Sequence, residues 1–100
     1  MDQVEIFKAL SNSTRLQILC WLKNPCVHFT EEHEVDMVKT GVCVGLIQKK
    51  SGLSQSTVSE YLSILQRAGF IQSTRIGQWT YYRRNEEAIT HLIRTLESDI

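Results

Sequence analysis

The chain of 100 residues lacks several features that would place it in other classes of protein. No apolar run approaches the roughly 20 residues that a membrane-spanning helix needs. The start Met1-Asp2-Gln3-Val4-Glu5 is acidic and has no basic-then-apolar order, so it does not resemble a signal peptide. Three cysteines, an odd number, do not make a disulfide framework. We therefore expect a cytoplasmic protein without a membrane partner, folded as one domain over residues 1–100.

Residues for catalysis are also scarce. No cysteine has a motif partner that would activate it as a nucleophile. The acidic run over residues 31–34 contains His33 but lacks the His-x-x-x-His frame of a metallohydrolase. We expect no enzyme activity and no cofactor.

The formal net charge of zero conceals an uneven distribution along the chain. Residues 45–84 carry six basic side chains against one acidic. Residues 1–44 carry four basic against six acidic, and residues 85–100 carry one against four. A basic block between acidic ends favours a nucleic acid as the partner of the central segment.

Apolar periodicity predicts a mainly α fold of the α+β kind, with about five helices and one β-hairpin. Residues 2–10 and 86–99 each show one apolar stripe at helical spacing. Residues 14–23 are apolar nearly all round, which predicts a buried central helix that Pro25 ends. Over residues 26–41 the pattern is weak, and we expect a long loop or loose hairpin in which residues 27–29 form a short strand.

The signals are sharper in the central segment. A short helix is predicted over residues 44–51, ended by Gly52, and Ser54 can cap a second helix over residues 55–68. After it, β-forming residues over 70–84 surround a Gly77-Gln78 turn and predict a hairpin. Residues 44–84 therefore read as a winged helix-turn-helix.

Such a unit can place its second helix in the DNA major groove, with the hairpin beside it. Gln, Ser and Thr side chains can bond base edges or phosphates, and hairpin arginines at positions 75, 83 and 84 can neutralise phosphates. A solvated polar face is the alternative for the helix, and a protein-interaction module without DNA binding is the alternative for the whole unit. The candidate DNA-contacting residues are Lys49, Ser54, Gln55, Ser56, Thr57, Ser59, Tyr61, Arg67, Arg75, Gln78 and Arg83.

Three stretches, residues 7–19, 52–65 and 68–83, together resemble the ArsR/SmtB family of bacterial metal- and redox-responsive repressors. The resemblance implies a homodimer held by helices 2–10 and 86–99, bound to operator DNA until an inducer releases it. A two-fold pair would read an inverted repeat, with its recognition helices about one DNA turn apart. The family commonly has histidine where Tyr61 stands, so its base preference is not carried over.

The family's sensor sites are incomplete in this chain. Cys43 aligns with the first residue of a cysteine-x-cysteine metal site, but Gly45 replaces the second. The last helix offers His91 without the Asp-x-His start of the other metal site. Cys20 matches one cysteine of a redox pair whose partner in the last helix is missing. For Cys20 we therefore favour a small buried apolar residue over a redox sensor, which is the alternative for this cysteine.

Cys26 and Cys43 bracket the segment that the resemblance does not explain. They could form a reversible disulfide that moves the reading unit. With His28 and His33 they could instead make a tetrahedral zinc site, although the spacing matches no compact zinc signature. A solvent-facing acidic loop with two unrelated thiols is the third alternative. The inducer thus stays open between redox chemistry, a metal and another signal.

Overall fold

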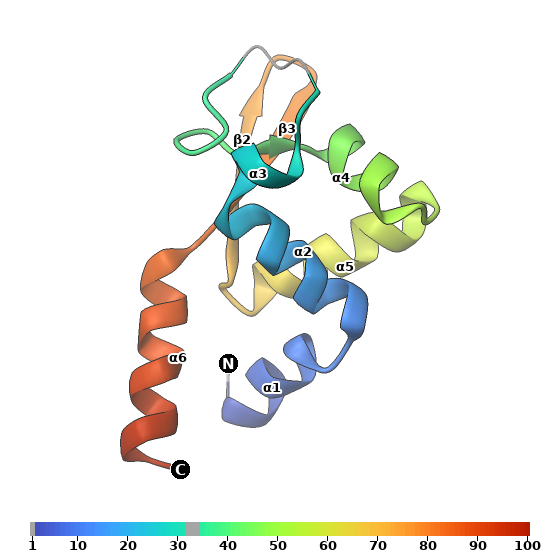
Figure 1. The fold of residues 1–100 in the computed structure, drawn as a ribbon. Coiled ribbons are helices and arrows are strands. Elements are labelled where there is room, and N and C mark those ends of the chain that lie inside the picture. The colour runs from blue at the N-terminus through green and yellow to red at the C-terminus, as the bar shows by residue number, and fades with distance from the viewer. Residues whose placement is uncertain (1, 32–34) are drawn as a thin grey trace.

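The computed structural model describes residues 2–31 and 35–100 (Figure 1). Its elements are α1 (Gln3–Leu10), α2 (Ser13–Lys23), α3 (Pro25–His28), β1 (Val42–Cys43), α4 (Val44–Ser51), α5 (Gln55–Arg67), β2 (Ile71–Ile76), β3 (Trp79–Arg84) and α6 (Glu86–Ser98). The predicted mainly α fold with a hairpin wing is confirmed, and α3 is an additional helix that was not predicted. Within these described ranges, no helix is both long and apolar enough to span a bilayer.

Short polar side chains set where the helices begin. The Asn12 carboxamide oxygen accepts a bond of 2.9 Å from the Arg15 amide and so caps α2. The Ser54 hydroxyl accepts a bond of 3.2 Å from the Thr57 amide at the start of α5. Gly52, with φ at +70°, ends α4 in the left-handed conformation that glycine adopts without steric cost. The predicted boundaries of the central segment are therefore confirmed to within about a residue.

The core lies where α2 and α5 pack against each other and against the base of the hairpin formed by β2 and β3 (Figure 1). Helix α2 contributes two pairs of adjacent residues to the core, namely Ile18, Leu19, Trp21 and Leu22. Helix α5 contributes the buried residues of one side, namely Val58, Leu62 and Leu65. The prediction that α2 is buried nearly all round is wrong, because Leu16 and Cys20 lie one turn apart on an exposed face.

The sheet has three antiparallel strands in the order β1-β3-β2. The hairpin register pairs Ile76 with Trp79 around the turn, where Gly77 has φ at +60°. The third strand, β1, was not predicted, and it pairs along β3 at Tyr81 and Tyr82. Just before it, Gly41 has φ at +112°, and a Cβ atom there would collide with the Tyr82 carbonyl oxygen. Glycine at this position lets the chain reach the sheet.

The segment after α2 differs from its prediction. The expected strand over residues 27–29 is wrong, because Pro25 starts a single helical turn whose first carbonyl accepts a bond of 2.8 Å from the Phe29 amide. Phe29 is buried and meets the Trp21 ring edge-on, with 6.3 Å between ring centroids. The Lys50 ammonium of α4 lies 5.3 Å from the centroid of the Trp21 ring. Pro25 and Phe29 are thus packed into the core, whereas Cys26 and Val27 between them are exposed.

Candidate nucleic-acid interface

Helices α4 and α5 are joined by a turn whose hydroxyl groups bond to its own backbone. The Ser51 hydroxyl donates to the Gln48 carbonyl at 2.8 Å and accepts from the Leu53 amide at 3.2 Å. The Ser54 hydroxyl donates to the Thr57 hydroxyl at 2.9 Å in addition to capping the helix. These bonds fix the direction in which α5 leaves the turn.

The N-terminal half of α5 presents an exposed polar face. Val58 and Leu62 hold the adjoining side of the helix in the core. Ser59 lies four residues after Gln55 and three after Ser56, so the three share one side of the helix, and all three are exposed. The free amides of the first turn and the positive end of the helix dipole favour an anion at this end of the helix. The face can therefore meet base edges and a phosphate together.

Three other candidates do not join this face. Tyr61 is partly buried, and its hydroxyl accepts a bond of 3.4 Å from the Asn12 carboxamide of α2. The Lys49 ammonium lies 3.8 Å from the Glu31 carboxylate. Arg67 lies in the last turn of α5, about 18 Å along the helix axis from Gln55.

The wing carries a second group of exposed side chains. Arg75, Gln78 and Arg83 are all exposed on the hairpin. The Arg75 guanidinium donates a bond of 3.1 Å to the Gly77 carbonyl and so lies along the turn. Trp79, which the sequence analysis did not single out, is 54% exposed at the start of β3. Alternation of side chains along a strand could have indicated that position.

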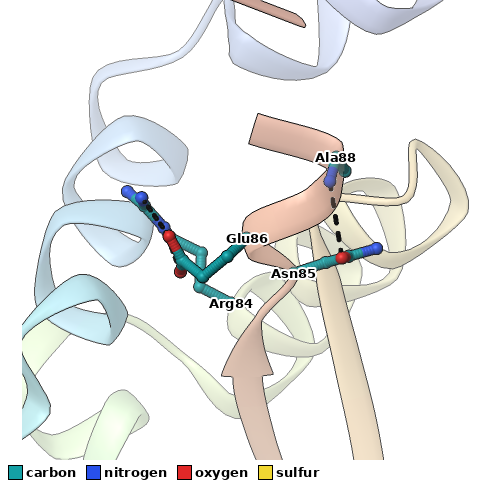
Figure 2. Close-up of polar contacts among 4 residues, drawn as sticks. All are labelled: Arg84, Asn85, Glu86 and Ala88. Carbon is teal, nitrogen blue, oxygen red and sulfur yellow. Dashed lines mark hydrogen bonds and ion pairs between the residues drawn. The ribbon is translucent and has the colours of Figure 1, made fainter. Parts of the chain in front are cut away.

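Arg84 differs from the other hairpin arginines because an ion pair holds it. Its Nε and Nη2 atoms donate to the two carboxylate oxygens of Glu86 at 2.8 and 2.7 Å (Figure 2). The Arg84 side chain is only 13% exposed. The hydrogen bond from Arg84, which outweighs the opposing effect of burial, lowers the pKa of the Glu86 carboxyl. Arg84 therefore stabilises the start of α6 and does not extend from the wing.

Asn85 joins the wing, the end of α5 and the start of α6. Its carboxamide oxygen accepts from the Ala88 amide at 3.4 Å and caps α6 (Figure 2). Its carboxamide nitrogen donates to the Gly69 carbonyl at 3.0 Å, and its backbone amide donates to the Phe70 carbonyl at 2.8 Å. The start of α6 is thus fixed to the segment that connects α5 with β2.

The surface of α6 is unusual for a helix with an apolar stripe, because none of its residues is buried. Ile93 and Leu96 are each about half exposed. Val4 of α1 and Ile100 are exposed as well. A cleft of about 300 Å³ lies between α1 and α6, the two helices for which the sequence predicts a dimer role.

All three cysteines are free thiols. The prediction that Cys20 is buried is wrong, since it lies on the exposed face of α2. Cys26 is exposed in α3, and Cys43 is partly buried in β1, directly before α4. Among residues 2–31 and 35–100, no three His, Cys, Asp or Glu side chains gather as ligands for a metal. His28 is partly buried, and His33 lies outside the described residues.

Known proteins share both the sequence and the fold. The model of the bacterial regulatory protein, arsR family, matches residues 42–73. The HTH-type transcriptional regulator YbzH of Bacillus subtilis is 53% identical over 100% of both chains. A Halobacterium salinarum protein, provisionally named arsenical resistance operon repressor ArsR2, is 31% identical over 94% of this chain and 67% of its own.

Solved structures agree. The homodimeric winged helix-turn-helix DNA-binding domain of Mb0332 from Mycobacterium bovis is 26% identical and has a TM-score of 0.64. The match covers 96% of this chain and 77% of that one. The polar face of α5, the wing beside it and these relatives lead to one conclusion. The chain belongs to the ArsR family of winged helix-turn-helix proteins and is a DNA-binding transcriptional regulator, not an enzyme.

Proposed function

We propose that this regulator is a homodimeric repressor that binds an inverted-repeat operator and is released by an inducer. Residues 44–84 form its reading unit. The observation that carries the proposal is the exposed polar face of α5, oriented by the bonded turn before it and followed by a wing with exposed arginines. This is the arrangement that lets a helix enter the major groove while a hairpin contacts the backbone beside it.

Different residues are proposed to contact the base edges and the phosphates. Gln55 can pair bidentately with adenine, and Ser56 and Ser59 can bond neighbouring base edges. Ser54 and Thr57, tied to each other at the start of the helix, hold its first turn near a phosphate. Arg75 and Arg83 of the wing neutralise phosphates, and Gln78 at the turn can bond one. Lys49 and Arg67 can contribute phosphate contacts only at the margins of this face.

A second copy of the chain accounts for the exposed stripe of α6. The helices over residues 2–10 and 86–99 carry the apolar side chains that one protomer leaves half covered. Burying such side chains against another protomer stabilises a domain this small. The Mb0332 domain, which shares this fold, is homodimeric. Repression is supported by the provisional repressor name of ArsR2.

DNA reading is tested by selecting a duplex from a random pool with the full chain. Its affinity is then measured by fluorescence anisotropy as the KCl concentration is raised. Binding through phosphates should weaken with a log-log slope of about −0.9 for each phosphate contacted. A scrambled duplex of the same composition is the control. Equal binding of both duplexes would contradict operator recognition, and the absence of binding would favour a protein partner instead.

Repression is tested by transcription in vitro from a promoter that overlaps the selected duplex. The regulator is expected to lower transcript yield in proportion to the occupancy of its site. The Gln55→Ala variant, which lacks one base contact, should require more protein for the same effect. Stimulated transcription would show an activator.

The inducer is proposed to be an oxidant that acts on Cys26 and Cys43. Two thiols would lose two electrons and two protons to a peroxide, giving a disulfide and water. Cys43 directly precedes α4 and pairs with Tyr81 of the wing, so constraining it would disturb both parts of the reading unit. Oxidised protein should release the selected duplex and reduced protein should bind it, with Cys43→Ser unaffected by peroxide. Release by zinc or arsenite alone would favour the metal alternative.

A further inference from the structure

Three helices meet at one side chain, Arg15 near the start of α2. Its guanidinium Nε donates a bond of 2.7 Å to the Ala9 carbonyl, and its Nη2 donates one of 3.0 Å to the Lys8 carbonyl. Both carbonyls belong to the last turn of α1, where the helix itself leaves backbone acceptors free, and the Lys8 carbonyl also accepts a bond of 3.1 Å from the Ser11 amide. A cation at this end also complements the helix dipole. Arg15 thus fixes the end of α1 to α2.

The same guanidinium also contacts the recognition helix. Its carbon atom lies 5.3 Å from the centroid of the Tyr61 ring, within the range of a cation–π contact. The Tyr61 hydroxyl accepts its bond from Asn12, the residue that caps α2 and bonds the Arg15 amide. Two residues of one turn therefore hold both the ring and the hydroxyl of Tyr61.

The position of Tyr61 on α5 makes this contact important for reading. Tyr61 follows Ser59 by two residues, or about 200° around the helix axis, so the two side chains point to nearly opposite sides. It lies three residues after Val58, beside the buried stripe. Holding Tyr61 against α2 adds to the buried residues Val58, Leu62 and Leu65 a further constraint on the rotation of α5 about its axis. That rotation decides which way Gln55 and Ser59 point.

We propose that Arg15 is a positioning residue for DNA recognition. It orients α5 through its contact with Tyr61, and its bonds to the end of α1 fix this orientation relative to α1. Tyr61 acts here as the contact point on α5 and not as a reader of bases. Since α1 is one of the proposed dimer helices, the contact also links the spacing of the two protomers to the angle of each recognition helix. The inference rests on DNA reading by α5.

The experiment compares the selected duplex with the scrambled one, using the full chain. Arg15→Gln and Tyr61→Leu should each lower affinity for the selected duplex by about fivefold, the factor that a contact of this kind supports. Affinity for the scrambled duplex should change less than twofold, because nonspecific binding needs no exact helix angle. The double variant should lose clearly less than the product of the two single losses, since both substitutions remove the same contact between Arg15 and Tyr61. Lys23→Gln, which removes a charge from the exposed end of the same helix, is the matched control.

Conservative variants separate positioning from folding. Arg15→Lys keeps a cation over the ring and should regain part of the lost affinity. Tyr61→Phe keeps the ring and should bind within about twofold of the original chain, unlike Tyr61→Leu. The comparison of Tyr61→Phe with Tyr61→Leu tests the positioning role even if Arg15→Gln does not fold.

Several results would overturn the proposal. They are equal losses on both duplexes, additive losses in the double variant, or indistinguishable binding by the Phe and Leu variants. A changed base preference in Tyr61→Phe would place the hydroxyl on DNA and would also overturn it. If the original chain selects no duplex, DNA reading itself fails and the inference falls with it. If the original chain discriminates and the variants match it, only the positioning role fails.

Discussion

Helices α5 and α6 both contain 13 residues and both carry one apolar stripe, yet their surroundings are opposite. In α5 the stripe is fully buried at Val58, Leu62 and Leu65. In α6 no residue is buried, and Ile93 and Leu96 are about half exposed. The same periodicity therefore means a fully buried stripe in α5 and a partly covered one in α6, where Ala88, Ile89 and Leu92 pack against the core while Ile93 and Leu96 stay exposed. The proposed dimer would cover this exposed part of α6.

The largest loss of stability is expected from a substitution in the buried stripe of α5. Leu62→Ala removes a side chain with no solvent exposure and should lower the free energy of unfolding by about 2–5 kcal/mol. That is a large part of the total for a small domain. Leu96→Ala in α6 is the matched control and should cost under about 1 kcal/mol in dilute protein, where the monomer dominates. Urea unfolding measures both, and equal losses would contradict the contrast between the helices.

The next largest effect is expected on dimer formation, from a substitution in the exposed stripe of α6. Leu96→Glu places a charge in the proposed dimer contact and should raise the dimer dissociation constant by at least about tenfold. Sedimentation over a concentration series measures it. Glu97→Gln, at the neighbouring exposed position, should leave the dimer unchanged. Should Leu96→Glu remain as dimeric as the original chain, the stripe of α6 is not the interface.

The wing offers an effect of intermediate size. Arg83→Gln removes one exposed cation from β3, so the log-log salt slope of DNA binding should become smaller by about 0.9. Arg75→Gln should do the same at the other strand. Arg94→Gln removes the same charge from an exposed position on α6, outside the reading unit, and is the control. An unchanged slope in Arg83→Gln would exclude a phosphate contact by that residue.

The smallest effect is a pH dependence at the junction before α6. The hydrogen bond from Arg84 lowers the pKa of Glu86 from its ordinary value of 4.5, so the folded chain holds its carboxylate charged. The resulting stability is fully present above pH 4.5 and is lost as the pH falls through the lowered pKa. Because the Glu86 side chain is 63% exposed, water screens the pair, and its contribution is under about 1 kcal/mol.

Thermal unfolding of Glu86→Gln between pH 7 and pH 3 tests this dependence. The variant should be slightly less stable at neutral pH, and the difference should vanish in acid. Glu87→Gln, at the exposed position one residue further along, is the matched control for the loss of one negative charge at this end of α6. A difference that stays constant over the whole range would mean that the ion pair does not stabilise the fold.

The parts of the fold that sequence predicts are those determined by neighbours along the chain. The end of α4 at Gly52 and the cap of α5 at Ser54 depend on residues within one turn. The hairpin depends on the Gly77 turn between two β-forming runs. The polar face of α5 could be predicted for the same reason, because it is the complement of a regular buried stripe.

The parts that sequence could not predict depend on partners far along the chain. Strand β1 contains two residues, too few for alternation, and exists because Val42 pairs with Tyr82. The contact of Arg15 with Tyr61 joins residues 46 positions apart, and no local pattern encodes it. Cys20 looked buried because its neighbours are apolar, but the exposed side of α2 falls at its position. Helix α3 depends on Pro25 at its first position, because a proline after a helical pattern can end one helix or begin the next.

The position of β3 at the centre of the sheet also bears on how the protein behaves in concentrated solution. Strand β1 covers one edge of β3, so β2 forms the outer edge on the other side. An uncovered strand edge can pair with a strand of another molecule and start aggregation. Along β2, residues 72–75 are all exposed and polar, and Arg75 adds a charge. This edge therefore carries the polar and charged side chains that disfavour the addition of a strand from another molecule.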